Sequence, residues 1–344
     1  MQIISTLRRT RQLIGIDELT DNDILHIYDV FDRKEINLML KKGTPKYIVG
    51  DHYSWADPQE FSGLPLYVLP LYAEKDARLI SQAKDHSNDI NTNQCFNFII
   101  NKKLINRFLC IKFVEFFNLD NFDYTWSGVD QRFDMTDIIK ELDMLGNQSP
   151  LDAEAKSFIL SPLKLEKRII SFPSQTIDNV CISNYGGTIW TWNNGLNKLF
   201  LNSAISLITE SVSHQKVSTF TEKTVYSVLG MTFPLWVGGG CYQAREWKKI
   251  GFDTFDDVID HSYQSYNTLI ERCYYAFAQN LEILSNIDKA KELRLIHKDR
   301  LLKNRELMMQ NQLQKFIAKE IENYPEDLKT QMPKVLQYFG TTLN

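Results

Sequence analysis

Short apolar runs alternate with segments of helical spacing along this sequence, and that alternation limits the fold more than any other feature. Runs at 24–31, 47–50, 66–72 and 95–100 have the length and composition of buried strands. The segment 104–117, which follows the last of them, has the apolar spacing of a helix. Strands that alternate with helices build sheets covered by helices, so the sequence predicts an α/β protein.

A second block of alternation follows a stretch that lacks it. Residues 147–178 contain three prolines and little periodic pattern. Beyond them, 219–230 has the pattern of a loop that opens a helix, and 233–240 that of a strand that runs into a glycine turn. From residue 262 onward the pattern is helical. The proline-containing stretch therefore marks the expected domain boundary.

The length of the chain agrees with two domains, because 344 residues exceed the ~100–200 residues of a single one. We expect an N-terminal α/β domain at 1–165 and a second α/β domain at 166–285. Helices at 286–344 complete the chain, and in one arrangement they cross back to the first domain.

The composition excludes several classes of protein. The chain has 39 Lys+Arg against 43 Asp+Glu, whereas proteins that bind nucleic acid over their whole surface are basic. Five cysteines without C-x-x-C spacing favour reduced thiols over a zinc site or a disulfide framework. No apolar run approaches the ~18–20 residues that span a bilayer. We therefore expect a cytoplasmic protein with no membrane contact and no obligate protein partner.

One segment departs from the acidic balance. Between Lys289 and Arg305 seven basic residues stand against two acidic ones, a local excess of +5. Two interpretations remain open: the solvated face of a helix, or a patch that faces the phosphates of nucleic acid or of another polyanion. In the second interpretation, Lys298 and Arg300 are candidate acceptor-binding residues.

The strongest chemical signal lies at 221–223. If Thr221 caps a helix, the free N–H groups and the positive end of that helix meet the preceding loop, and Lys223 adds a full positive charge there. These groups suit a phosphate or a diphosphate. Glu222 can accept hydrogen bonds from a pair of sugar hydroxyls, such as those of a ribose. The alternative for Glu222 and Lys223 is an ordinary pair of residues that opens a helix.

Three of the chain's 15 glycines stand together at Gly238, Gly239 and Gly240. At the end of a strand in an α/β sheet, they would offer bare backbone to a ligand. A turn that joins strand to helix is the alternative.

The Thr-Glu-Lys motif, followed by an apolar strand with Pro234 and a glycine turn, resembles the donor half of fucosyltransferase-like glycosyltransferases. A fuller pattern is similar to glycosyltransferase-like proteins common in tailed-phage genomes: Phe233-Pro234, Gly251-Phe252-x-Thr254-Phe255 and Asp260-x-Ser262-Tyr263. The segment 96–117, leading to 124–128, is also similar to that group. The resemblance covers residues 93–130 and 199–275.

This resemblance implies a GT-B-like fold, in which two Rossmann-like domains face a cleft, with a helical C-terminal segment. It implies that Glu222 contacts the ribose and Lys223 the diphosphate of a nucleotide-sugar donor, with a UDP-sugar favoured over a GDP-sugar and no metal required. The other implied donor-binding residues are Thr221, Gly238, Gly239, Gly240, Arg107, Lys102 and Tyr263. For Arg107, an exposed helical arginine is the alternative.

Transfer to a hydroxyl also needs a base that takes the proton of the acceptor, on a loop at a strand end of the first domain. Asp51 and His52 open such a loop, which also holds Tyr53 and Trp55, two aromatic residues able to stack on a sugar or a nucleobase. Asp29 is the second candidate for the base. The alternative is an aromatic loop that packs on its own domain.

The sequence therefore predicts a glycosyltransferase that moves a sugar from a nucleotide-diphosphate donor to a hydroxyl. If the phage resemblance holds, the acceptor is a 5-hydroxymethylated pyrimidine in viral DNA within the host cytoplasm, extruded from the duplex or met single-stranded. One alternative acceptor is a surface polysaccharide or other glycan. A further alternative is a non-catalytic nucleotide-binding or structural protein with the same fold.

Overall fold

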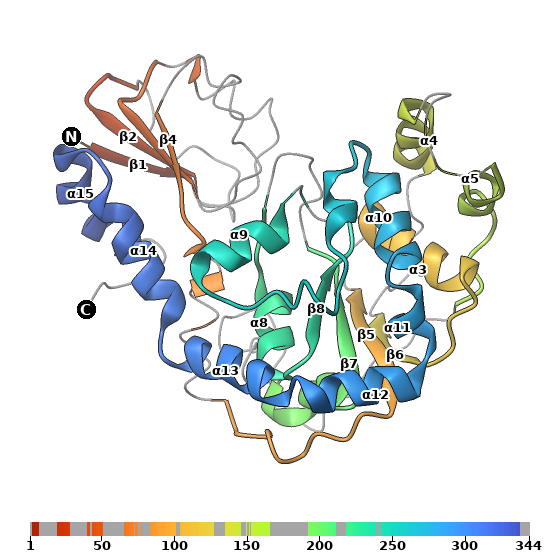
Figure 1. Ribbon diagram of the computed structural model, residues 1–344. Helices are drawn as coiled ribbons and strands as arrows, with labels where there is room; N and C mark the ends of the chain where they lie inside the picture. The colour runs from red at the N-terminus through yellow and green to blue at the C-terminus, as the bar shows by residue number, and fades with distance from the viewer. Residues whose placement is uncertain are drawn as a thin grey trace.

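Two parallel sheets form the framework of the computed structural model (Figure 1). The structure describes residues 2–6, 19–27, 40–41, 43–50, 65–71, 73–74, 77, 83–100, 104–126, 135–145, 149, 151, 153–165, 192–210, 218–238, 240 and 242–337. Every statement below concerns these residues.

The first sheet takes its four strands in chain order, β1-β2-β3-β4, and every neighbouring pair is parallel. Its strands are β1 (Gln2–Thr6), β2 (Asp23–Ile27), β3 (Tyr47–Gly50) and β4 (Leu66–Val68). Three of them lie in apolar runs from which strands are predicted, so the sequence pattern for β2, β3 and β4 is confirmed.

The second sheet is also parallel but has the order β6-β5-β7-β8. Its strands are β5 (Gln94–Ile100), β6 (Phe122–Trp126), β7 (Ser203–Ile208) and β8 (Phe233–Trp236). The chain adds β6 on one side of β5 and then returns to add β7 and β8 on the other side. The strand order therefore reverses between β5 and β7, and ligands of open α/β sheets bind outside the carboxyl ends of the strands at such a reversal.

This pairing moves the boundary between the two halves of the molecule. Phe96 of β5 lies in register with Ile205 of β7, so the predicted division at residue 165 cuts through the second sheet. The two sheets instead separate between β4 and β5. The proline-containing stretch lies between β6 and β7 in the chain, two strands of one sheet, and a local pattern cannot distinguish such a connection from a domain linker.

Helices cover both faces of the second sheet and make a three-layer arrangement (Figure 1). One face packs against α3 (Ile105–Phe116), α4 (Met135–Met144), α5 (Ala153–Ile159), α10 (Leu269–Ala278), α11 (Leu281–Ser285) and α12 (Ile287–Ile296). The other packs against η3 (Trp192–Leu196), α7 (Asn197–Leu201), α8 (Glu222–Leu229) and α9 (Gln243–Ile250). Successive residues of β8 supply both cores, since Leu235 belongs to the first and Trp236 to the second.

The C-terminal helices connect the two sheets. α13 (Lys298–Met309) packs on the second sheet, whereas α14 (Gln312–Glu322) and α15 (Glu326–Gln337) lie beside the first (Figure 1). Ile317 and Leu328 from these helices are fully buried against Ile24 and Val49 of the first sheet. Asn311, with φ 59°, makes the turn between α13 and α14.

The amino ends of β5, β7 and β8 are joined by the buried Arg294 of α12. Its guanidinium makes five hydrogen bonds, to the hydroxyl of Thr92 and to the carbonyls of Phe200, Leu201, Gly230 and Met231. Each acceptor lies just before one of the three strands, so α12 closes this edge and leaves the opposite, carboxyl edge for a ligand. No helix in the described part of the chain is long and apolar enough to cross a membrane.

Candidate functional site

Charged side chains gather at the carboxyl ends of β5 and β7, where the strand order of the second sheet reverses. Glu210 lies two residues beyond β7, and Arg107 lies in the first turn of α3, the helix that follows β5. Glu222 and Lys223 open α8, the helix that follows β7. We refer to Arg107, Glu210, Glu222 and Lys223 as the charged cluster.

Glu210 organises the start of α8 from within the protein. Its carboxylate is fully buried and accepts hydrogen bonds from the Thr221 amide at 3.0 Å and from the Thr224 hydroxyl at 2.7 Å. The Thr221 hydroxyl donates to the same carboxylate. Burial raises the pKa of Glu210, and the neighbouring Lys223 ammonium opposes that rise. The carboxylate thus holds the segment before α8 in place.

Thr221 is the N-cap of α8, as its predicted role requires, because its side chain accepts from the amide of Lys223. The Lys223 ammonium is almost fully buried and lies 2.7 Å from a carboxylate oxygen of Glu222. Burial disfavours the ionised Glu222 carboxyl, but Lys223 and Arg107 outweigh that effect and lower its pKa to about 2. Glu222 is therefore an anion at neutral pH, with its side chain still 30% exposed.

Arg107 has more hydrogen-bonding capacity than the protein uses. The residue is 1% exposed, and among the described residues its side chain makes one long hydrogen bond, 3.4 Å from a terminal nitrogen to the carbonyl of Thr209. The Nε and the other terminal nitrogen are buried without a partner among the described residues. Burial lowers the pKa of Arg107, and the carboxylates of Glu222 and Glu210 oppose that change. The predicted alternative, an exposed helical arginine, is wrong.

Asn106 shows the same imbalance beside it. Its side-chain amide donates to the carbonyl of Glu210 at 2.9 Å, while its own Oδ1 is buried without a partner. Unsatisfied buried polar atoms cost roughly 1–3 kcal/mol each, so several in one place indicate a site that a ligand completes. The unused N–H groups of Arg107 and the N-terminus of α8 are donors that suit an anion such as a phosphate, while Lys223 is already paired with Glu222.

Gly238 serves packing in this structure. It has φ +61°, and a Cβ at its position would lie 2.4 Å from the sulfur of Cys273 and 2.9 Å from the Cβ of Asn106. Glycine therefore allows the end of β8 to approach α3 and α10 closely. Gly240 is buried, and the Tyr263 hydroxyl, also buried, donates to the carbonyl of Trp236 at 2.8 Å. Burial raises the pKa of Tyr263, so its phenol stays neutral and keeps the hydrogen that it donates to β8.

Lys298 and Arg300 lie at the opposite edge of the second sheet. Arg300 makes ion pairs with Asp253 and Asp257, each at 2.7 Å, and the neighbouring His297 ring lies 6.0 Å from Phe233 at the start of β8. The structure therefore does not bring these two residues to the charged cluster. Much of the local +5 is also compensated, since Arg294 is buried and Arg305 pairs with Asp85 at 2.8 Å.

Several predicted site residues lie outside the described part of the chain: Asp51, His52, Asp29, Tyr53, Trp55, Lys102 and Gly239. Their roles stay predictions. Sequence reasoning missed Glu210 and Asn106. The only signal for Glu210 is an acidic residue directly after a buried strand, and Asn106 has none beyond its place next to Arg107.

Among the described residues, no group of three or more His, Cys, Asp or Glu side chains could hold a metal ion. Comparisons with protein-family models, with curated proteins and with solved structures find no match to this chain.

Proposed function

We propose that this protein is a GT-B-type glycosyltransferase that moves a sugar from a nucleotide-diphosphate donor to a hydroxyl acceptor. One observation carries the proposal: Arg107 is buried with two guanidinium nitrogens that have no partner among the described residues, beside Lys223 and the start of α8, where the strand order of the second sheet reverses. A diphosphate supplies the acceptor oxygens that these groups lack.

The same arrangement suits the chemistry of the transfer. When the acceptor oxygen attacks the anomeric carbon, the bond to the diphosphate breaks and negative charge grows on the departing oxygen. Arg107, Lys223 and the positive end of α8 are fixed in place before that charge develops, which is how preorganised sites lower a barrier. Glu222, an anion with a partly exposed carboxylate, is placed to accept from the ribose hydroxyls.

The two-sheet framework supports the GT-B part of the proposal. A pocket of about 810 Å³ lies where β4 of the first sheet meets α9 and α14, so the two halves enclose space between them. The helices α14 and α15 pack on the first sheet after α13 has packed on the second. The base that takes the acceptor proton then belongs to the first half, with Asp51, His52 and Asp29 as its candidates.

The position of the basic segment bears on the acceptor. Arg294, in the middle of 289–305, binds the amino ends of the strands, whereas the charged cluster lies at their carboxyl ends. β7 alone has six residues, which at about 3.3 Å each separate the two edges by roughly 20 Å. A modified pyrimidine in DNA therefore has to be held by other parts of the protein, and a glycan acceptor makes no demand on this segment.

The donor site is tested by thermal unfolding with UDP and GDP. A ligand at 100 times its dissociation constant adds about 2.7 kcal/mol to the free energy of unfolding, so we expect a clear rise in melting temperature with one of the two. Lys223→Met keeps the volume of the side chain and removes its charge, and should abolish that rise. Lys303→Met, an exposed lysine on α13, is the matched control and should leave it intact.

Transfer itself is read from the mass of the acceptor. The protein is incubated with UDP- and GDP-sugars and either hydroxymethylated DNA or a mixture of glycans. A gain of one sugar on either acceptor supports the enzyme. Nucleotide binding without transfer or hydrolysis of any donor would instead support the non-catalytic alternative, and no stabilisation by either nucleotide would refute the donor site.

A further inference from the structure

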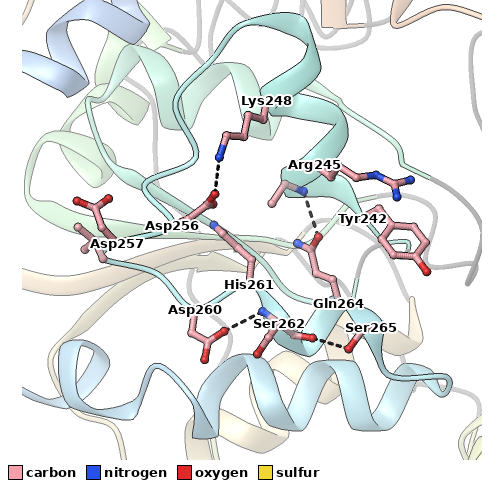
Figure 2. A pocket seen from close by; sticks show the side chains of 12 residues that line it. Tyr242, Arg245, Lys248, Asp256, Asp257, Asp260, His261, Ser262, Gln264 and Ser265 are labelled. Atoms are coloured by element: carbon pink, nitrogen blue, oxygen red, sulfur yellow. Dashed lines mark hydrogen bonds and ion pairs between the residues drawn. The ribbon is translucent and has the colours of Figure 1, made fainter.

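A pocket of about 800 Å³ opens beyond the carboxyl end of β8, between the start of α9 and η4 (Ser262–Ser265) (Figure 2). Tyr242, Arg245, His261 and Gln264 are among its lining residues. Sequence reasoning assigned it no role, and the groups described above leave it unused.

Tyr242 is held in the pocket at a cost to the backbone. Its φ is +79°, in the left-handed region that favours glycine, and the residue is nevertheless an aromatic one, 47% exposed. Such backbone strain persists only where the surroundings enforce it and is concentrated at functional sites. The Arg245 guanidinium stacks on the Tyr242 ring, 4.1 Å from its centroid. A phenol and a guanidinium together make a flat platform on which a planar heterocycle can stack.

Polar groups next to this platform suit the edge of such a ring. The buried Gln264 accepts from the Ala244 amide at 3.1 Å, and its Nε2 makes one long contact, 3.4 Å, to the Tyr263 hydroxyl. His261 Nε2 lies 3.0 Å from the Thr254 carbonyl, which can only accept, so this nitrogen carries the hydrogen. The lone pair on His261 Nδ1 then has no partner among the residues that the structure describes. Burial lowers the pKa of His261, which keeps the ring neutral.

Charges in the pocket largely cancel. Asp256 pairs with Lys248 at 2.8 Å, and Asp257 pairs with Arg300 at 2.7 Å, and Figure 2 shows the first pair at the far side of the pocket from Tyr242. A phosphate finds no surplus of positive charge here. An uncharged ring is the better fit.

The pocket is tied directly to the start of α8. Gln243, the first residue of α9, donates from its side chain to the Thr219 carbonyl at 2.9 Å, two residues before the N-cap. The Trp236 indole donates to the Thr224 hydroxyl at 3.1 Å in the first turn of α8, and its ring lies 5.7 Å from His261. Trp236 thus connects His261 of the pocket with Thr224, the residue that follows Lys223 of the charged cluster.

We propose that this pocket binds the nucleobase of the donor, with the base stacked on the Tyr242–Arg245 platform and its polar edge directed to Gln264 and His261. The inference rests on the proposed function, because it assumes a diphosphate at the charged cluster. It identifies the part of the protein that contacts the nucleobase, and it gives the strained backbone at Tyr242 a role in holding the ring that stacks on the base.

The test compares the affinities for UDP, GDP and inorganic pyrophosphate by calorimetry in three proteins: wild type, Tyr242→Gly and Tyr242→Phe. In the wild type, one nucleoside diphosphate should bind at least tenfold more tightly than pyrophosphate. Tyr242→Gly should lose about tenfold in nucleotide affinity and leave that for pyrophosphate unchanged. It should also raise the melting temperature, because glycine adopts a positive φ without strain. Tyr242→Phe keeps the platform and should bind as the wild type does.

Two results overturn this inference and leave the phosphate site standing: equal affinity of the wild type for pyrophosphate and both nucleotides, or full nucleotide affinity in Tyr242→Gly. Failure of the wild type to bind any of the three ligands would overturn the proposed function and this inference together. Loss of pyrophosphate binding in Lys223→Met, with retention in Tyr242→Gly, separates the two sites.

Discussion

Two buried arginines stand at opposite edges of the second sheet, and they are used in opposite ways. Arg294, at the amino edge, makes five hydrogen bonds, four of them to carbonyls. Arg107, at the carboxyl edge, makes one bond of 3.4 Å within the described part of the chain, and two of its nitrogens have no partner there. Burial lowers the pKa of both, that of Arg294 to about 9.

Both arginines are buried, so burial does not distinguish a structural arginine from a functional one. The number of hydrogen bonds that the protein makes to each guanidinium does. Arg294 is a crosslink whose N–H groups are consumed by the protein itself. Arg107 is also desolvated, but the protein offers it few hydrogen bonds. Natural proteins tolerate such a group where a ligand supplies the missing contacts. Each prediction below tests one side of this comparison.

The largest effect is expected from Arg294→Met. The change leaves the four carbonyls at the ends of α7 and α8 without their donor, and several unsatisfied buried acceptors together cost about 3–5 kcal/mol. Urea denaturation should show a loss of that size in the free energy of unfolding. A loss below about 1 kcal/mol would mean that water or neighbouring groups replace the guanidinium. It would contradict the role of Arg294 as a crosslink between the strand ends.

Arg107→Met should behave in the opposite way. Because the protein gives this guanidinium one long hydrogen bond where Arg294 has five, we expect a smaller loss in the free energy of unfolding without ligand than for Arg294→Met. The stabilisation by UDP or GDP, about 2.7 kcal/mol at 100 times the dissociation constant, should disappear. Lys298→Met, on the exposed surface of the amino edge, serves as the control and should change neither quantity. Destabilisation as large as that of Arg294→Met would make Arg107 structural.

The smallest effect is expected from Glu222→Gln and depends on pH. The carboxyl has a pKa of about 2 in the folded protein against 4.5 as its ordinary value, so the unfolded chain takes up its proton first as the pH falls. The stabilisation from the ionised carboxylate is complete above about pH 4.5 and is lost toward pH 2. Urea denaturation at pH 6 and pH 3 should therefore give a difference on the order of 1–3 kcal/mol that Glu222→Gln lacks. A variant with the wild-type pH dependence would contradict the pairing of Glu222 with Lys223.

Local elements of this fold follow from local patterns. The apolar runs that precede polar residues became β3 and β5, and Thr221 caps α8 because a threonine before a helical segment can accept from its first free amides. Part of the charged cluster could be predicted for the same reason, because the motif at 221–223 places a helix cap, a carboxylate and an ammonium at three consecutive residues.

Other features depend on partners distant in the chain. Nothing local tells that β5 pairs with β7 and not with β4, so the sequence could not show that the predicted division at residue 165 falls within the second sheet. The excess of positive charge at 289–305 suggested a phosphate-facing patch, but two of its arginines, Arg300 and Arg305, pair with Asp253, Asp257 and Asp85 from other elements. Glu210 became important only because the turn into α8 encloses it.

The return of α14 and α15 to the first sheet has a consequence for how the protein is made. The strands of that sheet are translated before those of the second sheet, yet the apolar side chains that cover them, from Ile317 to Leu336, are translated after it. The second sheet has all its strands once Trp236 has emerged. The first sheet therefore keeps an apolar face uncovered until after the second sheet has all its strands.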